Sequence, residues 1–240
     1  VDTLGGVASP LYPRYTRIPA RRKVTFTTAA DNQPEVEIVV FQGERPLARD
    51  NKTLGNFKLG GIPPAQRGTP QIEVTFDIDA NGILNVSAKD LATQREQSIT
   101  ITASSGLTKD EIDKMVREAE AHKSEDAKRK DEIEAKNQAD QIIYSTEKLL
   151  SQNAGKLPAA EEQKLRDAIE ELKKVKDTGG LDQIRQAIDK VNQSSQSLAQ
   201  LLYDQAKQQN PQGEAPPPPQ GDPSQKKGGD VIDAEFEDVK

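Results

Sequence analysis

The sequence has no cysteine and no tryptophan, and only one histidine among its 240 residues. The lack of cysteine excludes disulfides and thiol chemistry and fits a reducing compartment, so we expect a cytoplasmic protein. The one histidine, His122, stands in a polar segment without a second ligand at metal-site spacing. The glycine pairs at 5–6 and 60–61 lack the spacing of nucleotide-binding loops and are typical of turns. No catalytic set is recognisable, and we expect the chain not to be an enzyme.

Hydrophobic residues are also scarce, at 33% of the chain, and the mean hydropathy is -0.77. No apolar run is long enough to span a bilayer, and the first residues, VDTLGG, do not resemble a signal peptide, so we expect a soluble protein. The net charge of -6 is uneven, because residues 1–105 hold 12 Lys+Arg and 11 Asp+Glu, whereas the rest hold 21 and 28. The absence of a basic field argues against nucleic acid as a partner.

The most regular pattern lies between Arg67 and Asp90. Apolar residues alternate with polar ones at Ile72, Val74, Phe76 and Ile78, and again at Leu84, Val86 and Ala88. Between the two runs stands Asn81-Gly82, a pair that favours a tight turn with two positive φ angles. The pattern predicts a half-buried antiparallel hairpin.

Shorter alternating runs at residues 22–30, 36–42 and 98–102 predict further strands, separated by turn residues such as those at 31–34 and 60–64. Several short strands at this spacing are typical of an antiparallel β-sandwich. We therefore predict a β-sandwich domain over residues 1–105.

The period changes after residue 106. Thr108 and Glu111 form a capping box before an apolar stripe at helical spacing, and residues 122–137 are then almost entirely polar. Two more helices are predicted after Pro158 and after the glycines at 179–180. The fold class is thus β + α, with a helical part at 106–208, whereas residues 209–240 are too rich in proline and glycine to fold and form an acidic, disordered tail.

Several long motifs point to one protein family. They are DTLGG at 2–6, FTTAADNQ at 26–33, FQGER at 41–45, the stretch from DNKTLG to VSAKD at 50–90, SSGLTKDEI at 104–112 and the end DVIDAEFEDVK. These motifs closely resemble the substrate-binding half of the bacterial seventy-kilodalton heat-shock (Hsp70) chaperones. The resemblance covers nearly the whole chain.

The resemblance implies that the sandwich holds an extended peptide and that the helical part closes over it as a lid. The positions that match the family's peptide-binding pocket are Val1, Thr3, Phe26, Val36, Ile38 and Ile72. Leu4 and Ala29 match an arch over the peptide, and Thr27 and Gln33 match polar contacts to its main chain. Without the resemblance, Phe26, Val36, Ile38 and Ile72 would be read as ordinary core residues.

The resemblance also implies a latch between sandwich and lid. Arg67 and Asp140 match the family's ion pair, which would be worth only about 0 to 1 kcal/mol if exposed. Asp31 matches a second latch position, whose partner is often histidine in the family and is Tyr144 in this sequence. A tyrosine carries no charge near neutral pH, so we expect this contact to depend little on pH.

The implied function is that of a chaperone module for stress conditions, which binds unfolded or nascent polypeptides. Members of the family also carry a nucleotide-binding domain, a linker and a first strand ahead of the position where this sequence begins. ATP and Mg are therefore expected in that domain of the intact protein, with a J-domain cochaperone and a nucleotide exchange factor as partners. An edge left open by a missing strand would allow self-association through groove, lid or tail. The alternatives are a scaffold that binds no client peptide and, more remotely, a hydrolase.

Overall fold

The computed structural model describes residues 1–102, 107–155 and 157–209, and the β + α fold class is confirmed. The chain divides into two compact units between Ala127 and Lys128, within the first helix. The tail predicted for residues 209–240 lies, from residue 210 onward, outside the described residues.

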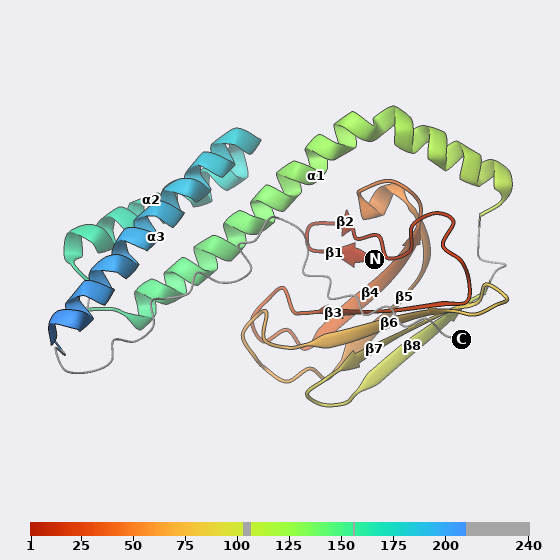
Figure 1. Ribbon diagram of the computed structural model, residues 1–240, viewed down its shortest axis with the longest axis horizontal. Coiled ribbons are helices and arrows are strands. Elements are labelled where there is room, and N and C mark those ends of the chain that lie inside the picture. The colour runs from red at the N-terminus through yellow and green to blue at the C-terminus, as the bar shows by residue number, and fades with distance from the viewer. Residues whose placement is uncertain (103–106, 156, 210–240) are drawn as a thin grey trace. The chain divides into compact units, whose positions relative to one another are not determined.

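The described residues of the first unit form three antiparallel sheets. The strands are β1 (Asp2–Thr3), β2 (Val7–Ala8), β3 (Ala20–Phe26), β4 (Glu35–Gln42), β5 (Lys52–Gly60), β6 (Ile72–Ile78), β7 (Leu84–Asp90) and β8 (Glu96–Ile101), with a short 3-10 helix at Ala48–Asp50. Four strands pair in the order β3-β6-β7-β8, while β4 pairs with β5 and β1 with β2. Within this unit, the β4–β5 pair and the four-stranded sheet lie on two sides of one core (Figure 1).

Alternation along the strands builds that core, as the sequence pattern predicts. The buried side chains are Leu11, Val24, Ile38, Val40, Leu59, Ile62, Ile72, Val74, Phe76, Val86, Ala88 and Ile101. Each large aliphatic or aromatic side chain removed from water contributes about 1.5–3 kcal/mol. The apolar rows of β4–β5 and of the four-stranded sheet therefore hold the two sheets together.

The turn between β6 and β7 differs from the prediction. The last ladder pair is Ile78 with Leu84, and the Asp79 N–H donates to the Ile83 carbonyl at 3.0 Å, so the loop has three residues, 80–82. Gly82 has a φ of 78°, whereas Asn81 is not left-handed. The carboxylate of Asp79 accepts the backbone N–H of Asn81 at 2.8 Å and that of Ile83 at 2.9 Å. The prediction of a two-residue turn is wrong because this Asp79 side chain stabilises a wider loop.

Strand β5 has no counterpart among the predicted strands. Its apolar residues Leu54, Phe57 and Leu59 do not alternate, because Val40 pairs with Gly55 and Phe41 with Thr53, leaving Leu54 as an extra residue. This β-bulge shifts the side-chain pattern by one position. The run predicted at 22–30 is also shorter in the structure, since β3 ends at Phe26.

Helix α1 (Lys109–Gln152) begins at the predicted capping box. The backbone N–H of Thr108 donates to Glu111 Oε2 at 2.7 Å, and the N–H of Glu111 donates to Thr108 Oγ1 at 3.4 Å. The bonds from Thr108 lower the pKa of Glu111. The carboxylate that completes the cap is therefore ionised at neutral pH.

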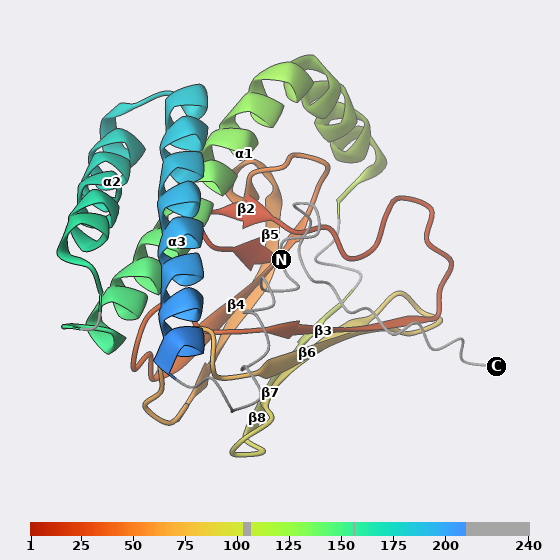
Figure 2. The ribbon, with the colours of Figure 1, turned by 60° about the vertical axis from the view of Figure 1, so that its left-hand side comes forward.

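The second unit is a bundle of the rest of α1 with α2 (Ala159–Thr178) and α3 (Leu181–Gln209), which run side by side (Figure 2). Its buried residues are Ala135, Ala139, Ile143, Leu150, Leu157, Leu165, Ala168, Ile169, Leu172, Ile184, Ala187, Ile188, Val191 and Leu198. As predicted, Pro158 stands at the start of α2 and Gly179 at its end. Among the helices the structure describes, none combines the length and apolar character needed to cross a membrane.

Gly55 allows β5 to approach β8 closely, and its replacement tests this packing. A Cβ added there would lie 2.9 Å from Ile99 Cδ1 and 3.5 Å from Ile101 Cδ1. Since the tip of Ile99 can move away from a single methyl group, valine is the informative substitution. We expect Gly55→Val to lower the free energy of unfolding by about 1–3 kcal/mol, measured by urea denaturation.

Gly60→Val is the matched control for this prediction, because it lies in the same strand and an added Cβ there meets no atom within 4 Å. Its effect should stay within about 0.5 kcal/mol. Equal losses for the two variants would contradict the close approach of β5 and β8.

Candidate functional site

Five of the six predicted pocket residues belong to a single apolar cluster in the first unit. Ile38 of β4 and Ile72 of β6 are buried, with 5% and 1% of their surface exposed. Phe26, opposite Ile72 in the ladder, packs partly exposed against the same cluster, as do Val1 and Val36. The cluster thus has a buried floor of two isoleucines and a partly open margin.

Thr3 and Leu4 lie in the β1–β2 hairpin, and β1 lies beside β4. The hydroxyl of Thr3 donates to the carbonyl of Val7 at 2.8 Å, so it holds the hairpin together. Leu4 is 54% exposed at the turn, a large apolar side chain in contact with solvent. Ala29, the other predicted arch residue, is exposed in the loop after β3. Both arch assignments stay predictions.

The Thr27 side chain connects its loop to the loop before β6, whereas the Gln33 side chain holds its own loop. The Thr27 hydroxyl donates to the carbonyl of Pro70 at 2.7 Å. Gln33 Oε1 accepts the N–H of Ala29 at 3.0 Å and of Ala30 at 3.2 Å, and Gln33 Nε2 donates to the Glu35 carbonyl at 2.8 Å. Their contact with a peptide main chain stays a prediction, and their observed role is to shape these loops.

Two loops beside the apolar cluster are joined by hydrogen bonds. Residues 27–34 follow β3, and residues 61–71 precede β6. Backbone bonds run from Asn32 N to Ala65 O at 2.7 Å, from Ile62 N to Pro34 O at 3.1 Å and from Gly68 N to Thr28 O at 3.1 Å. The predicted latch residues Asp31 and Arg67 meet here, because Arg67 N donates to Asp31 Oδ1 at 2.8 Å. The two loops therefore form one continuous, ordered rim.

One acidic residue, Asp2 of β1, adjoins Val1 at the margin of the apolar cluster. Glu35 and Glu37 alternate with Val36 and Ile38 along β4, so their side chains lie on the opposite face of that strand. Burial raises the pKa of Asp2, and the nearby Glu37 carboxylate raises it further, whereas the Val1 amino group and the Thr3 backbone lower it. On that opposite face, Lys58 Nζ donates to Glu35 Oε1 at 2.9 Å, so an ion pair occupies it.

The other two predicted latch residues, Asp140 and Tyr144, lie on α1 in the second unit. Lys176 of α2 donates to Asp140 Oδ1 at 2.7 Å, a contact that sequence reasoning missed. This hydrogen bond, together with the charge of Asp140, raises the pKa of Lys176. Asp140 thus stabilises the bundle, and the pairs Arg67–Asp140 and Asp31–Tyr144 stay predictions.

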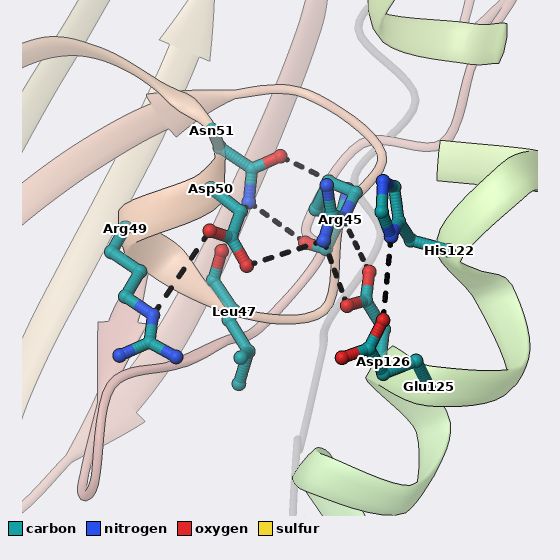
Figure 3. A network of polar contacts seen from close by, with 8 residues as sticks. All are labelled: Arg45, Leu47, Arg49, Asp50, Asn51, His122, Glu125 and Asp126. Atoms are coloured by element: carbon teal, nitrogen blue, oxygen red, sulfur yellow. Dashed lines mark hydrogen bonds and ion pairs between the residues drawn. The ribbon is translucent and has the colours of Figure 1, made fainter. Parts of the chain in front are cut away.

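A buried ion pair fixes the first part of α1 to the β-strands of its own unit. Arg45, in the loop after β4, donates from Nη2 to Asp126 Oδ1 at 2.8 Å and from Nε to Asp126 Oδ2 (Figure 3). Asp126 is only 1% exposed, and Arg45 Nη2 also lies 3.5 Å from Asp50 Oδ2. The hydrogen bonds that Arg45 donates to Asp126 are the main cause that raises the pKa of Arg45. The pair is bidentate and charge-assisted, which fixes its geometry.

Asn51 holds the loop that presents Arg45. Its Nδ2 donates to the carbonyls of Arg45 at 2.7 Å and Leu47 at 2.8 Å, and its Oδ1 accepts the N–H of Arg45 at 3.0 Å (Figure 3). Met115 of α1 covers the same loop, since a Cβ added at Gly43 would lie 2.9 Å from Met115 Cε. Met115 and Asp126 therefore both attach residues 109–127 to the loop after β4.

A comparison with models of known protein families identifies the family of this chain. The family model described as Hsp70 protein matches residues 1–204, most of the chain. The chain belongs to the Hsp70 family. Hsp70 membership gives the chain a chaperone-type role, associated with heat shock and stress, with unfolded polypeptides as its class of client.

Replacing Asp126 tests the anchor of α1. In Asp126→Asn, the buried guanidinium of Arg45 loses its ionic partner. We expect the free energy of unfolding to fall by about 2–4 kcal/mol. Amide hydrogen exchange in residues 109–127 should accelerate at least tenfold, because this helical part detaches locally. Asp113→Asn, an exposed change of the same kind on α1, should leave the exchange rates unchanged. Unaltered protection in Asp126→Asn would show that the ion pair is not the anchor.

Proposed function

We propose that the β unit of this Hsp70 chain binds extended, aliphatic-rich segments of unfolded polypeptides, and that the helical unit acts as its lid. The chain would then be the substrate-binding portion of a bacterial DnaK-type chaperone. The observation that carries the proposal is the apolar cluster in which Ile38 and Ile72 are buried while Val1, Phe26 and Val36 remain partly exposed. The joined loops at 27–34 and 61–71 provide an ordered margin beside it.

Such a site would recognise peptide segments of many different sequences. Main-chain hydrogen bonds admit any extended segment, and an apolar site selects a side chain that folded proteins hide. Burial of one aliphatic side chain contributes about 1.5–3 kcal/mol, and each main-chain hydrogen bond about 0.5–1.5 kcal/mol. The cost of ordering the peptide offsets part of these gains, and we expect a weak affinity near micromolar, equivalent to about -8 kcal/mol.

We propose that opening and closing of the lid are controlled in the intact protein. A nucleotide-binding domain would bind ATP and Mg and set the position of the lid. A J-domain cochaperone and a nucleotide exchange factor would act through that domain, in the cytoplasm. The support for this assignment is the family membership together with the motifs at 26–33 and 50–90.

Filling the apolar site tests client binding. We expect a fluorescent Leu-rich heptapeptide to bind the chain with micromolar affinity, and Val36→Phe to weaken it at least tenfold by occupying the site, as measured by fluorescence anisotropy. Val39→Phe is the matched control, because Val39 lies in the same strand on the opposite face.

Three results would contradict the proposal: equal binding by the Val36→Phe variant, equal binding of an all-polar heptapeptide, or a lack of saturable binding. The third would favour the alternative of a scaffold that binds no client. A similar loss of affinity in Val39→Phe would show that the effect is not specific to the apolar site.

The proposed latch predicts a kinetic effect. If Arg67 pairs with Asp140 over a bound peptide, Arg67→Ala should speed peptide dissociation about two- to fivefold, as expected for a pair worth up to about 1 kcal/mol. Stopped-flow displacement of the labelled heptapeptide measures this rate. Arg49→Ala, which removes an exposed arginine of the same unit, serves as the control. A dissociation rate unchanged by Arg67→Ala would remove the latch from the account.

A further inference from the structure

The loop before β3 presents an aromatic side chain to solvent in a fixed conformation. Tyr15 is 90% exposed and has a φ of 65°, and Ile18 is 47% exposed. Bulky residues seldom adopt a positive φ, so surrounding contacts must impose it. Thr16 provides one of these contacts, because its N–H and its hydroxyl donate to the Pro13 carbonyl at 3.2 and 2.6 Å.

A second contact fixes the loop to the core. The hydroxyl of Tyr12 donates to the carbonyl of Phe76 in β6 at 2.8 Å. Burial, reinforced by the nearby Asp77, raises the pKa of Tyr12 to about 12, so the hydroxyl keeps its proton at physiological pH. The loop is thus anchored on β6 while Tyr15 and Ile18 stay exposed. Exposed tyrosine on a preorganised loop is typical of a contact surface.

The loop and the start of β3 together are strongly basic. Between Asp2 and Asp31 the sequence holds five cations and no acidic residue. Arg14, Arg17 and Arg21 are exposed, and the Arg14 guanidinium lies 5.1 Å from the centre of the Tyr15 ring and 3.6 Å from Glu44. We call the set Arg14, Tyr15, Arg17, Ile18 and Arg21 the basic loop surface. It combines positive charge with an aromatic and an aliphatic contact.

We propose that the basic loop surface binds the acidic segment 230–240 of the same chain. This segment, DVIDAEFEDVK, holds five acidic residues and one lysine, and its apolar residues are Val231, Ile232, Phe236 and Val239. Residues 210–229 contain no large apolar side chain, so acidic and apolar character is concentrated in the last eleven residues. Charge and contact type are therefore complementary to those of the basic loop surface. Tethering through residues 210–229 makes the binding intramolecular and raises its effective concentration.

The apolar client site is a poorer match for this segment. That site is lined by apolar side chains and adjoins the carboxylate of Asp2, which is unfavourable for an acidic segment. The two sites also lie at opposite ends of β3, whose seven residues span about 20 Å. Binding of segment 230–240 at the basic loop surface goes beyond client binding and does not depend on it. Experiment can distinguish this surface from the apolar client site.

Paramagnetic broadening in the full chain tests the inference. Because the chain has no cysteine, Lys240→Cys provides a unique site for a nitroxide label. At about 50 mM salt, we expect the amide signals of residues 14–21 to lose at least half their intensity. They should recover near 0.5 M salt, where charges on the surface are screened.

Charge reversal of two residues provides the decisive comparison. Arg17→Glu combined with Arg21→Glu should abolish the broadening, whereas Lys174→Glu with Arg185→Glu, the same charge change on exposed residues of α2 and α3, should preserve it. Broadening centred on residues 29–38 would place the segment at the client site and overturn the inference. Broadening that survives reversal of Arg17 and Arg21, or that occurs at no site, would overturn it as well.

Discussion

The packing of the β4–β5 pair against the four-stranded sheet is the constraint on which the first unit depends. Alternating aliphatic residues of both sheets share one core, and Gly55 allows β5 to approach β8 closely. At the margin of this core, Phe26 and Val36 are only partly covered, while Ile38 and Ile72 below them are buried. The same hydrophobic contacts that stabilise the sandwich thus create the apolar surface that a client would contact.

The first helix shows how a largely polar segment can be fixed to the sheets of its own unit by a buried ion pair. Asp126 is buried within a stretch of α1 that is almost entirely polar, and its carboxylate is satisfied by the guanidinium of Arg45. An ion pair of this kind adds little net stability, but it specifies one arrangement, because either charge alone would be costly to bury. Asn51 holds the loop in the conformation in which Arg45 reaches Asp126.

Much of this architecture could be predicted from local sequence. The alternation in β6 and β7, the capping box at Thr108 and the helix boundary at Pro158 are short-range signals, and the structure confirms them. The apolar residues of the site were also recognisable as a set, although only the family resemblance separated them from ordinary core residues.

The features that could not be predicted depend on partners distant in the sequence. Leu54 forms a bulge only because β4 pairs with β5, which hides the alternation of β5. Arg45 and Asp126 are 81 positions apart, and Asp140 and Lys176 are 36 apart, so no periodic pattern marks either pair. Side-chain bonds such as those of Asp79 and Gln33 set loop shapes that turn propensities alone do not specify.

The central claim is that the apolar cluster of the β unit receives an aliphatic side chain of a client. The most direct measurement is a set of intermolecular nuclear Overhauser effects between a heptapeptide with one methyl-labelled leucine and the methyl groups of the chain. The account predicts contacts from that leucine to Val36, Ile38 and Ile72. Saturable binding with leucine contacts only to residues outside this cluster would contradict it.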